Sequence, residues 1–329
     1  MINTFNTLVY STMKAVFLDY ETVSNEDLDP SPLRAVLPDL TLFDESDEAQ
    51  VRERVAGAEA VLLNKVNITR SIIESSPGLK IIALSATGSN KIDVVAARER
   101  GVAVCNIRGY CTASVTQHVW GAILGLTHHL RDYATLATDG SWARNAQFTM
   151  LAHPIRELRG RTLGVVGWGE LGRGVAAVAA SFGVRVVVAN RHGGEPVPGR
   201  LDLRELLRVA DIVSLHCPLT DATRGMIGAA ELALMKPDAL LINTSRGALV
   251  DGAALAAALR AGRLGGAGID VLAQEPPVDG DPLLEPGIPN LIVTPHIAWA
   301  AREARQRCLA EMAENIIDFQ RGGRRGRVV

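Results

Sequence analysis

A glycine-rich GxGxxG segment at residues 167–172 constrains the fold more than any other feature of this chain. The apolar run 162–166, which predicts a strand, leads into it, and an amphipathic helical pattern follows it. In this context Gly167 permits a tight turn, Gly169 leaves room for a pyrophosphate, and Gly172 lets the helix pack close to the strand. Backbone N–H groups and the dipole at the helix start then face phosphates. The segment therefore predicts a dinucleotide-binding unit.

Short apolar runs alternate with amphipathic patterns along the whole chain, which is the order of a parallel sheet flanked by helices. The strands expected before the glycine segment are 15–18, 41–43, 60–63, 80–84 and 102–105, with helices at 48–56 and 92–99. The later strands are 162–166, 185–188, 212–216, 239–243, 268–271 and 291–294, with helices at 171–181, 203–209, 229–234 and 253–261. One long helix is expected at 113–130, then a polar stretch to 161, and a last helix at 300–319. The chain is thus expected to be an α/β protein with two halves.

The overall charge excludes some classes of partner. The 329 residues carry 34 basic and 36 acidic side chains, so the formal net charge is −2 and no strong field attracts nucleic acid or an anionic membrane. A basic tail, Arg321 to Arg327, is expected to be a frayed terminus. No uninterrupted apolar run reaches the roughly 20 residues that a membrane-spanning helix needs.

Cysteine usage and the amino-terminal segment indicate the compartment. The four cysteines form no CxxC pair and show no zinc-ligand spacing with histidine, so no metal site is expected. We interpret them as unpaired cysteines that pack as small apolar residues, which is typical of proteins in a reducing compartment. Residues 1–13 lack the charged and apolar regions of a signal peptide. We therefore expect a cytoplasmic protein.

The residue that ends the second strand of the dinucleotide-binding unit bears on cofactor choice. A carboxylate about 20 residues after the first glycine would bind the ribose 2′-hydroxyl of NAD. Asn190 occupies this place, and Arg191 follows it. A neutral amide does not repel a 2′-phosphate, and a guanidinium can pair with one. The sequence therefore favours NADP over NAD, with use of both left open.

Polar residues end several strands of the second half, at the edge where open α/β sheets bind ligands. Three of them suit the reduction of a 2-oxo acid by a nicotinamide. Arg246 can hold the substrate carboxylate and polarise the carbonyl, and His296 can protonate the oxygen. Glu275 can fix the tautomer of the imidazole and keep it charged at neutral pH. Sequence alone does not show that the three side chains meet.

Three blocks of sequence, at 241–251, 266–276 and 293–298, follow the glycine segment in fixed order. Together they resemble the D-isomer-specific 2-hydroxyacid dehydrogenase family over nearly the whole chain from Met13. The resemblance implies two Rossmann-like or flavodoxin-like, doubly wound parallel-sheet domains with the active site in the cleft between them. It implies a substrate domain at residues 1–108 and 297–329, with a dinucleotide-binding domain at 109–296 inserted within it.

The resemblance also implies roles for individual residues. Arg246, Glu275 and His296 correspond to the family's catalytic residues, with His296 as the acid and base. The implied cofactor contacts are Gly167, Gly169, Glu170, Leu171, Gly172, Asn190, Arg191, Cys217, Pro218, Thr244, Ser245, Arg246, Asp270, His296, Ala298 and Trp299. The implied substrate contacts are Lys65, Thr87, Gly88, Arg246 and His296. Asn190 departs from the family, in which many NAD-dependent members have aspartate.

Segments such as 18–22, 63–66 and 296–299 are most similar to glycerate dehydrogenases, also called hydroxypyruvate reductases, and to glyoxylate reductases. The implied substrate is therefore a small oxo acid, with D-3-phosphoglycerate and D-lactate dehydrogenase as alternatives. An alternative of another class is a dinucleotide-sensing corepressor, for which the sequence shows no peptide groove. The long helix at 113–130 resembles the family's dimerisation element, so a homodimer is expected.

Overall fold

The computed structural model describes residues 12–329, so expectations about the first eleven residues lie outside the described part of the chain. Residues 12–111 and 300–329 form one compact unit, called unit 1, and Thr112–Trp299 forms another, called unit 2. Unit 2 is thus inserted within unit 1. The expected domain boundaries, after residues 108 and 296, each lie three residues before those of the units.

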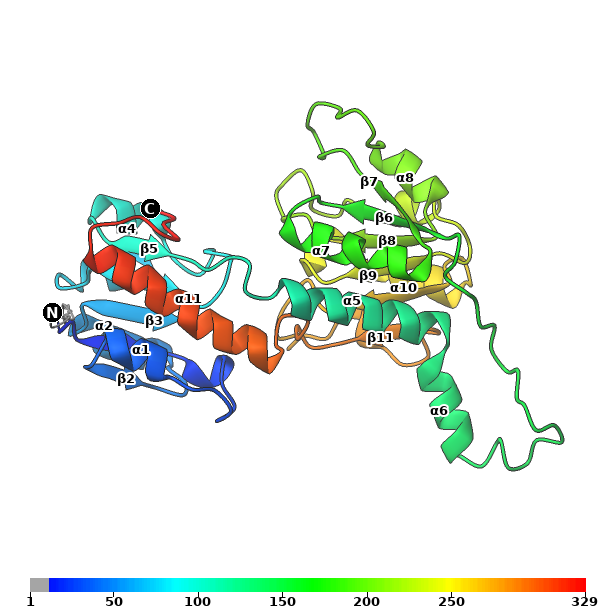
Figure 1. Cartoon of the computed structure of the whole chain (residues 1–329), viewed down its shortest axis with the longest axis horizontal. Coiled ribbons are helices and arrows are strands. Elements are labelled where there is room, and N and C mark those ends of the chain that lie inside the picture. Colours follow the sequence, from blue (N-terminus) through cyan, green and yellow to red (C-terminus); the bar gives the residue numbers. More distant parts are fainter. Residues whose placement is uncertain (1–11) are drawn as a thin grey trace, which may run out of the picture. The chain divides into compact units, whose positions relative to one another are not determined.

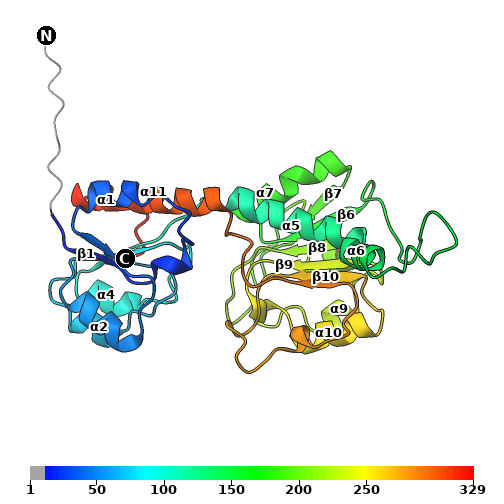
Figure 2. The ribbon, with the colours of Figure 1, turned by 90° about the horizontal axis from the view of Figure 1, so that it is seen from below.

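Unit 1 is a five-stranded parallel sheet covered by helices on both faces (Figure 1). Figure 2 shows α1 and α11 on one face and α2 and α4 on the other. The strands are β1 (Ala15–Phe17), β2 (Leu40–Leu42), β3 (Ala60–Leu63), β4 (Ile81–Leu84) and β5 (Ala103–Cys105). The helices are α1 (Ser31–Val36), α2 (Glu48–Ala56), α3 (Arg70–Glu74), α4 (Val94–Glu99) and α11 (Arg302–Gln320), with a 3₁₀ turn at Tyr20–Thr22.

Unit 2 holds a six-stranded parallel sheet. Its strands are β6 (Thr162–Val166), β7 (Arg185–Val188), β8 (Ile212–Leu215), β9 (Leu240–Asn243), β10 (Gly266–Ile269) and β11 (Leu291–Val293). Its helices are α5 (Thr112–Thr127), α6 (Leu130–Thr138), α7 (Glu170–Ala179), α8 (Leu203–Val209), α9 (Ala229–Leu232) and α10 (Gly252–Arg260). Short 3₁₀ turns lie at Ala180–Phe182, Gly247–Leu249 and Pro282–Leu284.

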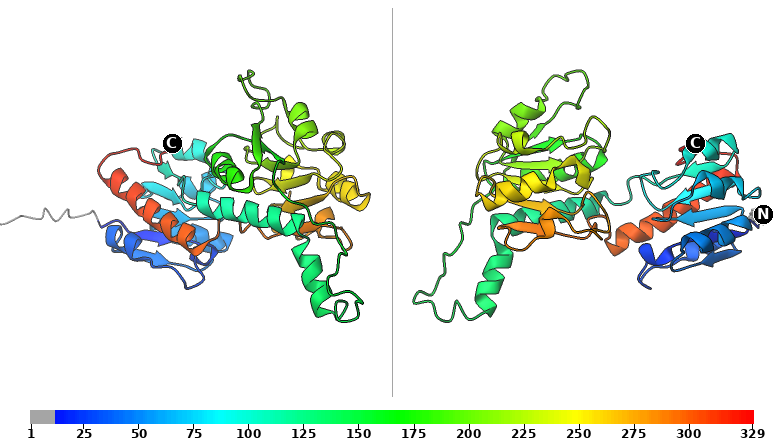
Figure 3. Two further views of the ribbon diagram at one scale, coloured as in Figure 1. Left: turned by 45° about the vertical axis from the view of Figure 1, so that its right-hand side comes forward. Right: turned by 180° about the vertical axis from the view of Figure 1, so that it is seen from behind.

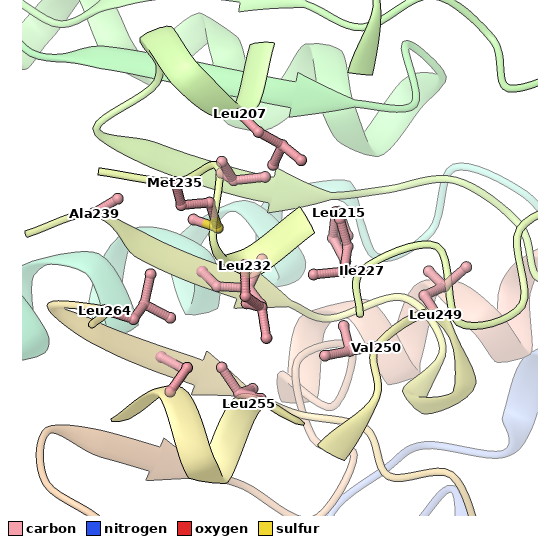
Figure 4. Close-up of a cluster of buried hydrophobic side chains, with 14 of the residues drawn as sticks. Leu207, Leu215, Ile227, Leu232, Met235, Ala239, Leu249, Val250, Leu255 and Leu264 are labelled. Atoms are coloured by element: carbon pink, nitrogen blue, oxygen red, sulfur yellow. The ribbon is translucent and has the colours of Figure 1, made fainter. Parts of the chain in front are cut away.

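The core of unit 2 explains how its helices attach to the sheet. Leu207 of α8, Leu232 of α9 and Leu255 of α10 pack with strand residues such as Leu215 in one buried cluster (Figure 4). On the other face of the sheet, α5 and α7 lie side by side, and Trp120 of α5 donates a hydrogen bond to the backbone of α7. Both faces of the sheet are therefore covered, as its mostly apolar strands require.

The strand order places the carboxyl ends of neighbouring strands where ligands bind. Unit 1 has the order β2-β1-β3-β4-β5, and unit 2 has the order β11-β10-β9-β8-β6-β7. In each sheet the order reverses between the first and the third strand along the chain, which are β1 and β3 in unit 1 and β6 and β8 in unit 2. Open α/β sheets bind ligands beyond the carboxyl ends of the strands at such a switch point.

The predicted α/β fold with parallel sheets is confirmed. Burial and helix capping in the structure explain the sequence patterns on which the prediction was based. Every residue of β3 and β4 is buried, which is why these two strands are continuous apolar runs. β8 and β9 are fully buried as well, and each carries one polar residue, Ser214 and Asn243. Aspartates mark helix starts: the Asp47 side chain accepts from the Gln50 backbone at α2, and the Asp202 side chain accepts from Glu205 at α8. The short helices α1 and α3 were not predicted.

The long helix expected at 113–130 is present as α5, but it ends three residues earlier than expected, and the polar stretch expected after it holds a further helix. Helix α5 ends at Thr127, His129 adopts a left-handed conformation with φ of 49°, and α6 begins at Leu130 within the expected polar stretch. His129 Nδ1 lies 3.1 Å from Asp132 Oδ2, which stabilises the turn. Helix α6 and the loop after it extend away from the sheet of unit 2 (Figure 3).

The carboxyl-terminal tail is not frayed, contrary to the expectation. The backbone N–H of Val328 donates to Val104 at 2.7 Å, so the tail pairs with the end of β5. The Arg325 guanidinium bonds the carboxylates of Glu311 and Glu314. Within residues 12–329 no helix is long and apolar enough to cross a membrane.

Candidate active site

The cofactor residues expected in unit 2 all follow the carboxyl ends of strands of one sheet. Residues 167–172 follow β6, Asn190 and Arg191 follow β7, Cys217 and Pro218 follow β8, Thr244 to Arg246 follow β9, Asp270 follows β10, and His296 to Trp299 follow β11. Because the strands are parallel, these residues share one edge of the sheet. The topology therefore gathers residues from six separate segments.

The glycine loop has the geometry of a phosphate cradle. Gly167 has φ of +102°, and a Cβ there would lie 2.5 Å from the carbonyl carbon of His216. A Cβ on Gly172 would lie 2.1 Å from the Gly167 oxygen, so the start of α7 needs glycine for close packing. Open space surrounds Gly169, the N-cap of α7, which provides no side-chain cap. The first N–H groups of α7 are thus left for an anionic ligand.

Buried polar atoms near this loop support the fit of a dinucleotide. Among the described residues, Thr244 Oγ1 and His216 Nδ1 are buried and have no hydrogen-bond partner. Such atoms carry a free-energy penalty unless a ligand or water satisfies them. Burial lowers the pKa of His216 to about 4, so its ring is neutral at physiological pH, and its Nε2 lies 2.8 Å from Ser214 Oγ.

The loops after β8 and β9 are joined to each other. Ser245 Oγ donates to the Cys217 carbonyl at 2.6 Å, and the Asn243 side chain bonds both the Ser245 N–H and the Arg246 carbonyl. A Cβ on Gly247 would lie 2.0 Å from the backbone of Leu272, so the loop after β9 also packs directly against the loop after β10. Arg246 therefore sits, with an exposed side chain, on a loop braced from both sides.

His296 and Glu275 form a direct pair. Glu275 Oε2 lies 2.7 Å from His296 Nδ1, and Glu275 Oε1 accepts the Leu272 N–H at 2.8 Å. Both side chains remain about one-third exposed. The carboxylate thus fixes the orientation of the imidazole and leaves Nε2 as the other proton-exchanging atom.

Asp270 holds the segment that carries His296. The Asp270 side chain is buried, with 1% of the residue exposed. Its Oδ1 accepts hydrogen bonds from the Ile297 N–H at 2.9 Å and from the Thr294 hydroxyl at 2.5 Å. Its Oδ2 accepts one from the Ala298 N–H at 2.8 Å. His296 itself has φ of +57°, a conformation that non-glycine residues rarely adopt. Trp299 Nε1 adds a bond to the His296 carbonyl at 2.9 Å.

The neutral amide expected to select the cofactor is part of a turn. Asn190 Oδ1 accepts the Val197 N–H at 2.9 Å, and the Asn190 N–H donates to the Leu201 carbonyl at 2.7 Å. Arg191 follows and is exposed. The end of β7 therefore offers an amide and a guanidinium, and no carboxylate at position 190.

The expected substrate contacts Lys65, Thr87 and Gly88 belong to unit 1. They follow β3 and β4, which are hydrogen-bonded neighbours, so their loops share one edge of that sheet. The Asn106 side chain donates to the Thr87 carbonyl at 2.6 Å and holds the second loop. The structure thus brings these three together on one sheet, and the catalytic candidates together on another.

Two carboxylates that organise the loops were missed by sequence reasoning in that role. Asp270 was expected only as a cofactor contact, and Asp19, in unit 1, was not singled out. Their position in the sequence could have indicated this role. Each aspartate lies just beyond a buried strand, at the edge of the sheet where the backbone N–H groups of loops need acceptors.

One group in the described part of the chain has the composition of a metal site. The candidate ligand atoms of His129, Asp132 and His153 lie within 4.8 Å of one another. The two rings stack with planes 15° apart and centroids 5.0 Å apart. Imidazole lone pairs lie in the ring plane, so nearly parallel stacked rings do not direct them at one ion. The geometry is that of a hydrogen-bonded turn, in which Tyr133 also holds the His153 backbone.

Comparisons with known proteins agree with this geometry. Residues 120–298 match the family described as D-isomer specific 2-hydroxyacid dehydrogenase, NAD binding domain. A glycerate dehydrogenase from Methylorubrum extorquens is 41% identical over 94% of this chain and 97% of its own length. A hydroxypyruvate reductase from Blautia hydrogenotrophica is 33% identical over 94% and 98%.

Solved structures share the architecture of the whole chain. The TT0316 protein from Thermus thermophilus superimposes with a TM-score of 0.83 at 35% identity, covering 96% of this chain and 99% of that one. The expected family is thereby confirmed, and with it an oxidoreductase that uses a nicotinamide cofactor and a small-molecule substrate. The chain belongs to the D-isomer-specific 2-hydroxyacid dehydrogenase family.

Proposed function

We propose that this enzyme interconverts hydroxypyruvate and D-glycerate, and glyoxylate and glycolate, with Arg246, Glu275 and His296 as its catalytic residues. The observation that carries the proposal is the 2.7 Å contact between His296 Nδ1 and Glu275 Oε2 at the carboxyl edge of the sheet. A paired imidazole at this edge is suited to exchange a proton with a substrate oxygen. The names of the two relatives support the choice of substrate.

A nicotinamide cofactor, held by the glycine loop at residues 167–172, would supply the hydride that C2 of the oxo acid accepts. His296 Nε2 gives its proton to the carbonyl oxygen, and Glu275 stabilises the positive charge of the ring before transfer. Arg246 pairs with the substrate carboxylate and polarises the carbonyl. The product is a 2-hydroxy acid, and the reverse reaction uses neutral His296 as the base.

Substrate choice is tested by turnover. The purified enzyme is mixed with NADPH or NADH and with hydroxypyruvate, glyoxylate, pyruvate or 3-phosphohydroxypyruvate, and loss of absorbance of the reduced cofactor is followed. The highest kcat/KM is expected for hydroxypyruvate, with D-glycerate as product. A higher value for 3-phosphohydroxypyruvate or pyruvate would transfer the assignment to the D-3-phosphoglycerate or D-lactate alternative. No turnover of any of the four would favour a binding protein.

We propose a preference for NADP over NAD, because position 190 carries no charge and Arg191 is exposed beside it. Replacing Asn190 by aspartate should shift the preference towards NADH. Since Asn190 Oδ1 already accepts the Val197 N–H, an aspartate oxygen can keep this bond, and the new charge repels a 2′-phosphate. The ratio of kcat/KM for NADPH over NADH should fall about tenfold, which corresponds to about 1.4 kcal/mol. A wild-type enzyme that strongly prefers NADH would reject the argument from Arg191.

We propose that the enzyme is a homodimer whose interface includes α6 and the loop after it. Phe148 and Leu151 of this loop are 91% and 83% exposed, and Leu130, Trp142 and Ile155 are exposed as well. A cluster of exposed large apolar residues is typical of an interaction surface, and two-fold dimers are the commonest assembly.

The double variant Phe148→Asp with Leu151→Asp should change the mass in solution from that of two chains to that of one, because charges there would be buried in the interface. Light scattering after size-exclusion chromatography measures this. Val278→Asp, at a 76% exposed position on another loop of unit 2, is the control and should remain dimeric. A monomeric wild type, or a dimeric double variant, would contradict the proposal.

All four cysteines are free thiols. We propose the cytoplasm as the compartment, because free thiols persist in a reducing environment.

A further inference from the structure

A buried carboxylate lies at the switch point of the sheet in unit 1. Asp19 comes two residues after β1, and the turn at residues 64–66 comes directly after β3. Strands β1 and β3 are neighbours in the sheet, and the strand order reverses between them. This is the position at which an α/β sheet binds its ligand, and it is the position of Lys65.

The Asp19 carboxylate accepts three consecutive backbone N–H groups. Its Oδ1 accepts from Asn64 at 2.8 Å, and its Oδ2 accepts from Lys65 at 2.5 Å and from Val66 at 3.1 Å. The Asn64 side chain donates to Thr22 Oγ1 at 3.0 Å, and the Thr22 hydroxyl donates back to the Asp19 carbonyl at 2.6 Å. The turn is therefore held on both sides by the segment after β1.

Two opposing effects act on the Asp19 carboxyl group. Asp19 is 3% exposed, and its burial raises its pKa above the ordinary value, against the lowering effect of the three N–H bonds and the Lys65 charge. A carboxyl group with a raised pKa in the folded state contributes stability when protonated, and that contribution is lost as the pH rises through the folded pKa. The three N–H bonds therefore tie this buried side chain to the turn at residues 64–66 although burial disfavours its charged form.

The held turn lies beside the second substrate loop. The Ser85 N–H and hydroxyl both donate to the Leu63 carbonyl, at 2.9 and 3.2 Å, so the chain enters both loops from paired backbone. Lys65 is exposed at this edge, whereas Asn64, its neighbour, is buried and fixed. The backbone of Lys65 is therefore fixed at the sheet edge that also carries the loop with Thr87 and Gly88.

We propose that Asp19 is a positioning residue for substrate binding: it fixes the turn at residues 64–66 so that the Lys65 ammonium attracts the carboxylate of the oxo acid. This inference rests on the proposed function and assigns a role in recognition of the anionic end of the substrate. Asp19 acts through the turn and needs no contact with the substrate.

A double-mutant cycle tests the proposal. The four proteins are wild type, Asp19→Asn, Lys65→Ala and the double variant, assayed with hydroxypyruvate at saturating cofactor. Asparagine keeps the shape of Asp19 and presents an NH₂ group where an acceptor is needed. Asp19→Asn should raise KM for hydroxypyruvate about tenfold, with kcat and the KM for cofactor within threefold of wild type. In the Lys65→Ala background the same change should alter KM less than twofold, because the two residues act in one step.

Amide hydrogen exchange gives a readout that does not depend on activity. In Asp19→Asn, exchange at residues 64–66 should accelerate at least tenfold, while β3 and β4 keep their protection. Asp47→Asn is the matched control, since Asp47 accepts one backbone N–H at the start of α2, away from the turn. It should leave KM and the exchange at 64–66 unchanged.

Several outcomes would overturn the inference. An equal rise in KM in both backgrounds would mean that Asp19 supports the fold in general, and unchanged protection at 64–66 would mean that it does not hold the turn. If Asp19→Asn does not fold, Thr22→Val loosens the same turn from its other side and must show the same dependence on Lys65. A wild type that turns over no oxo acid would refute the proposed function instead, which is a distinguishable result.

Discussion

Replacing His296 by alanine should lower kcat for hydroxypyruvate by about 10²–10⁴-fold, the range found for general acid and base groups. The ring is held at 2.7 Å by Glu275 and by a loop with four further hydrogen bonds, so alanine removes a proton donor whose orientation these contacts fix. The KM for the cofactor should change little if the glycine loop at 167–172 carries most of the cofactor affinity. Steady-state kinetics with both substrates measures the effect.

His128→Ala is a suitable control, because His128 is an exposed histidine of the same unit at the break between α5 and α6. Its kcat should equal that of the wild type. Glu275→Gln should fall between the two, since glutamine can still accept the Leu272 N–H but cannot stabilise a charged imidazole. A His296→Ala enzyme with a kcat within a few-fold of wild type would refute the assigned role of the histidine.

Most of the fold could be predicted, because buried parallel strands leave a strong pattern in the sequence. The runs at β3 and β4 are apolar without interruption, and helices alternate with the strands along the chain. The break at His129 could not be predicted in this way. It depends on contacts with Asp132, three residues later, and with His153, which periodicity does not register.

The candidate site was predicted only as a set of residues. Strand ends and the family blocks identified Arg246, Glu275 and His296, because chemistry restricts which residue types can stand there. The contacts that hold these residues were not predicted, since a sequence does not show which side chain accepts a hydrogen bond from which backbone N–H group. The left-handed conformation of His296 is the clearest example, because the residue type at position 296 does not indicate a positive φ.

The two units use the same device at different edges. In unit 1 the Asp19 carboxylate accepts three backbone N–H groups, and in unit 2 the Asp270 carboxylate accepts two backbone N–H groups and a hydroxyl. Each aspartate comes just after a buried strand. An aspartate side chain at this place can accept hydrogen bonds from several donors of a loop at once. The loop is thereby held in one conformation. Substitutions at these aspartates should therefore affect the loops more than the sheets.

Replacing Asp270 by asparagine should lower kcat by about 10²-fold, the scale of a displacement of about 1 Å in catalytic geometry. Asparagine has a single acceptor oxygen, so its NH₂ group must face either the Ala298 N–H or the donors of Thr294 and Ile297. Leaving such a buried donor unsatisfied costs about 1–3 kcal/mol. The segment would relax, and the strained backbone of His296, with φ of +57°, would be the first part to move.

Two measurements separate this loss of positioning from general unfolding. ADP-ribose carries the pyrophosphate for which the glycine loop is suited and lacks the nicotinamide ring. Its Kd in calorimetry should stay within about threefold of wild type, because the glycine loop lies after a different strand. Asp251→Asn, at an exposed carboxylate that caps α10, should leave both kcat and this Kd unchanged. If Asp270→Asn retained full kcat, the three hydrogen bonds of this carboxylate would not be what holds His296 against Glu275. If it lost ADP-ribose affinity in parallel with kcat, Asp270 would support the whole edge of the sheet, and the histidine would have no special dependence on it.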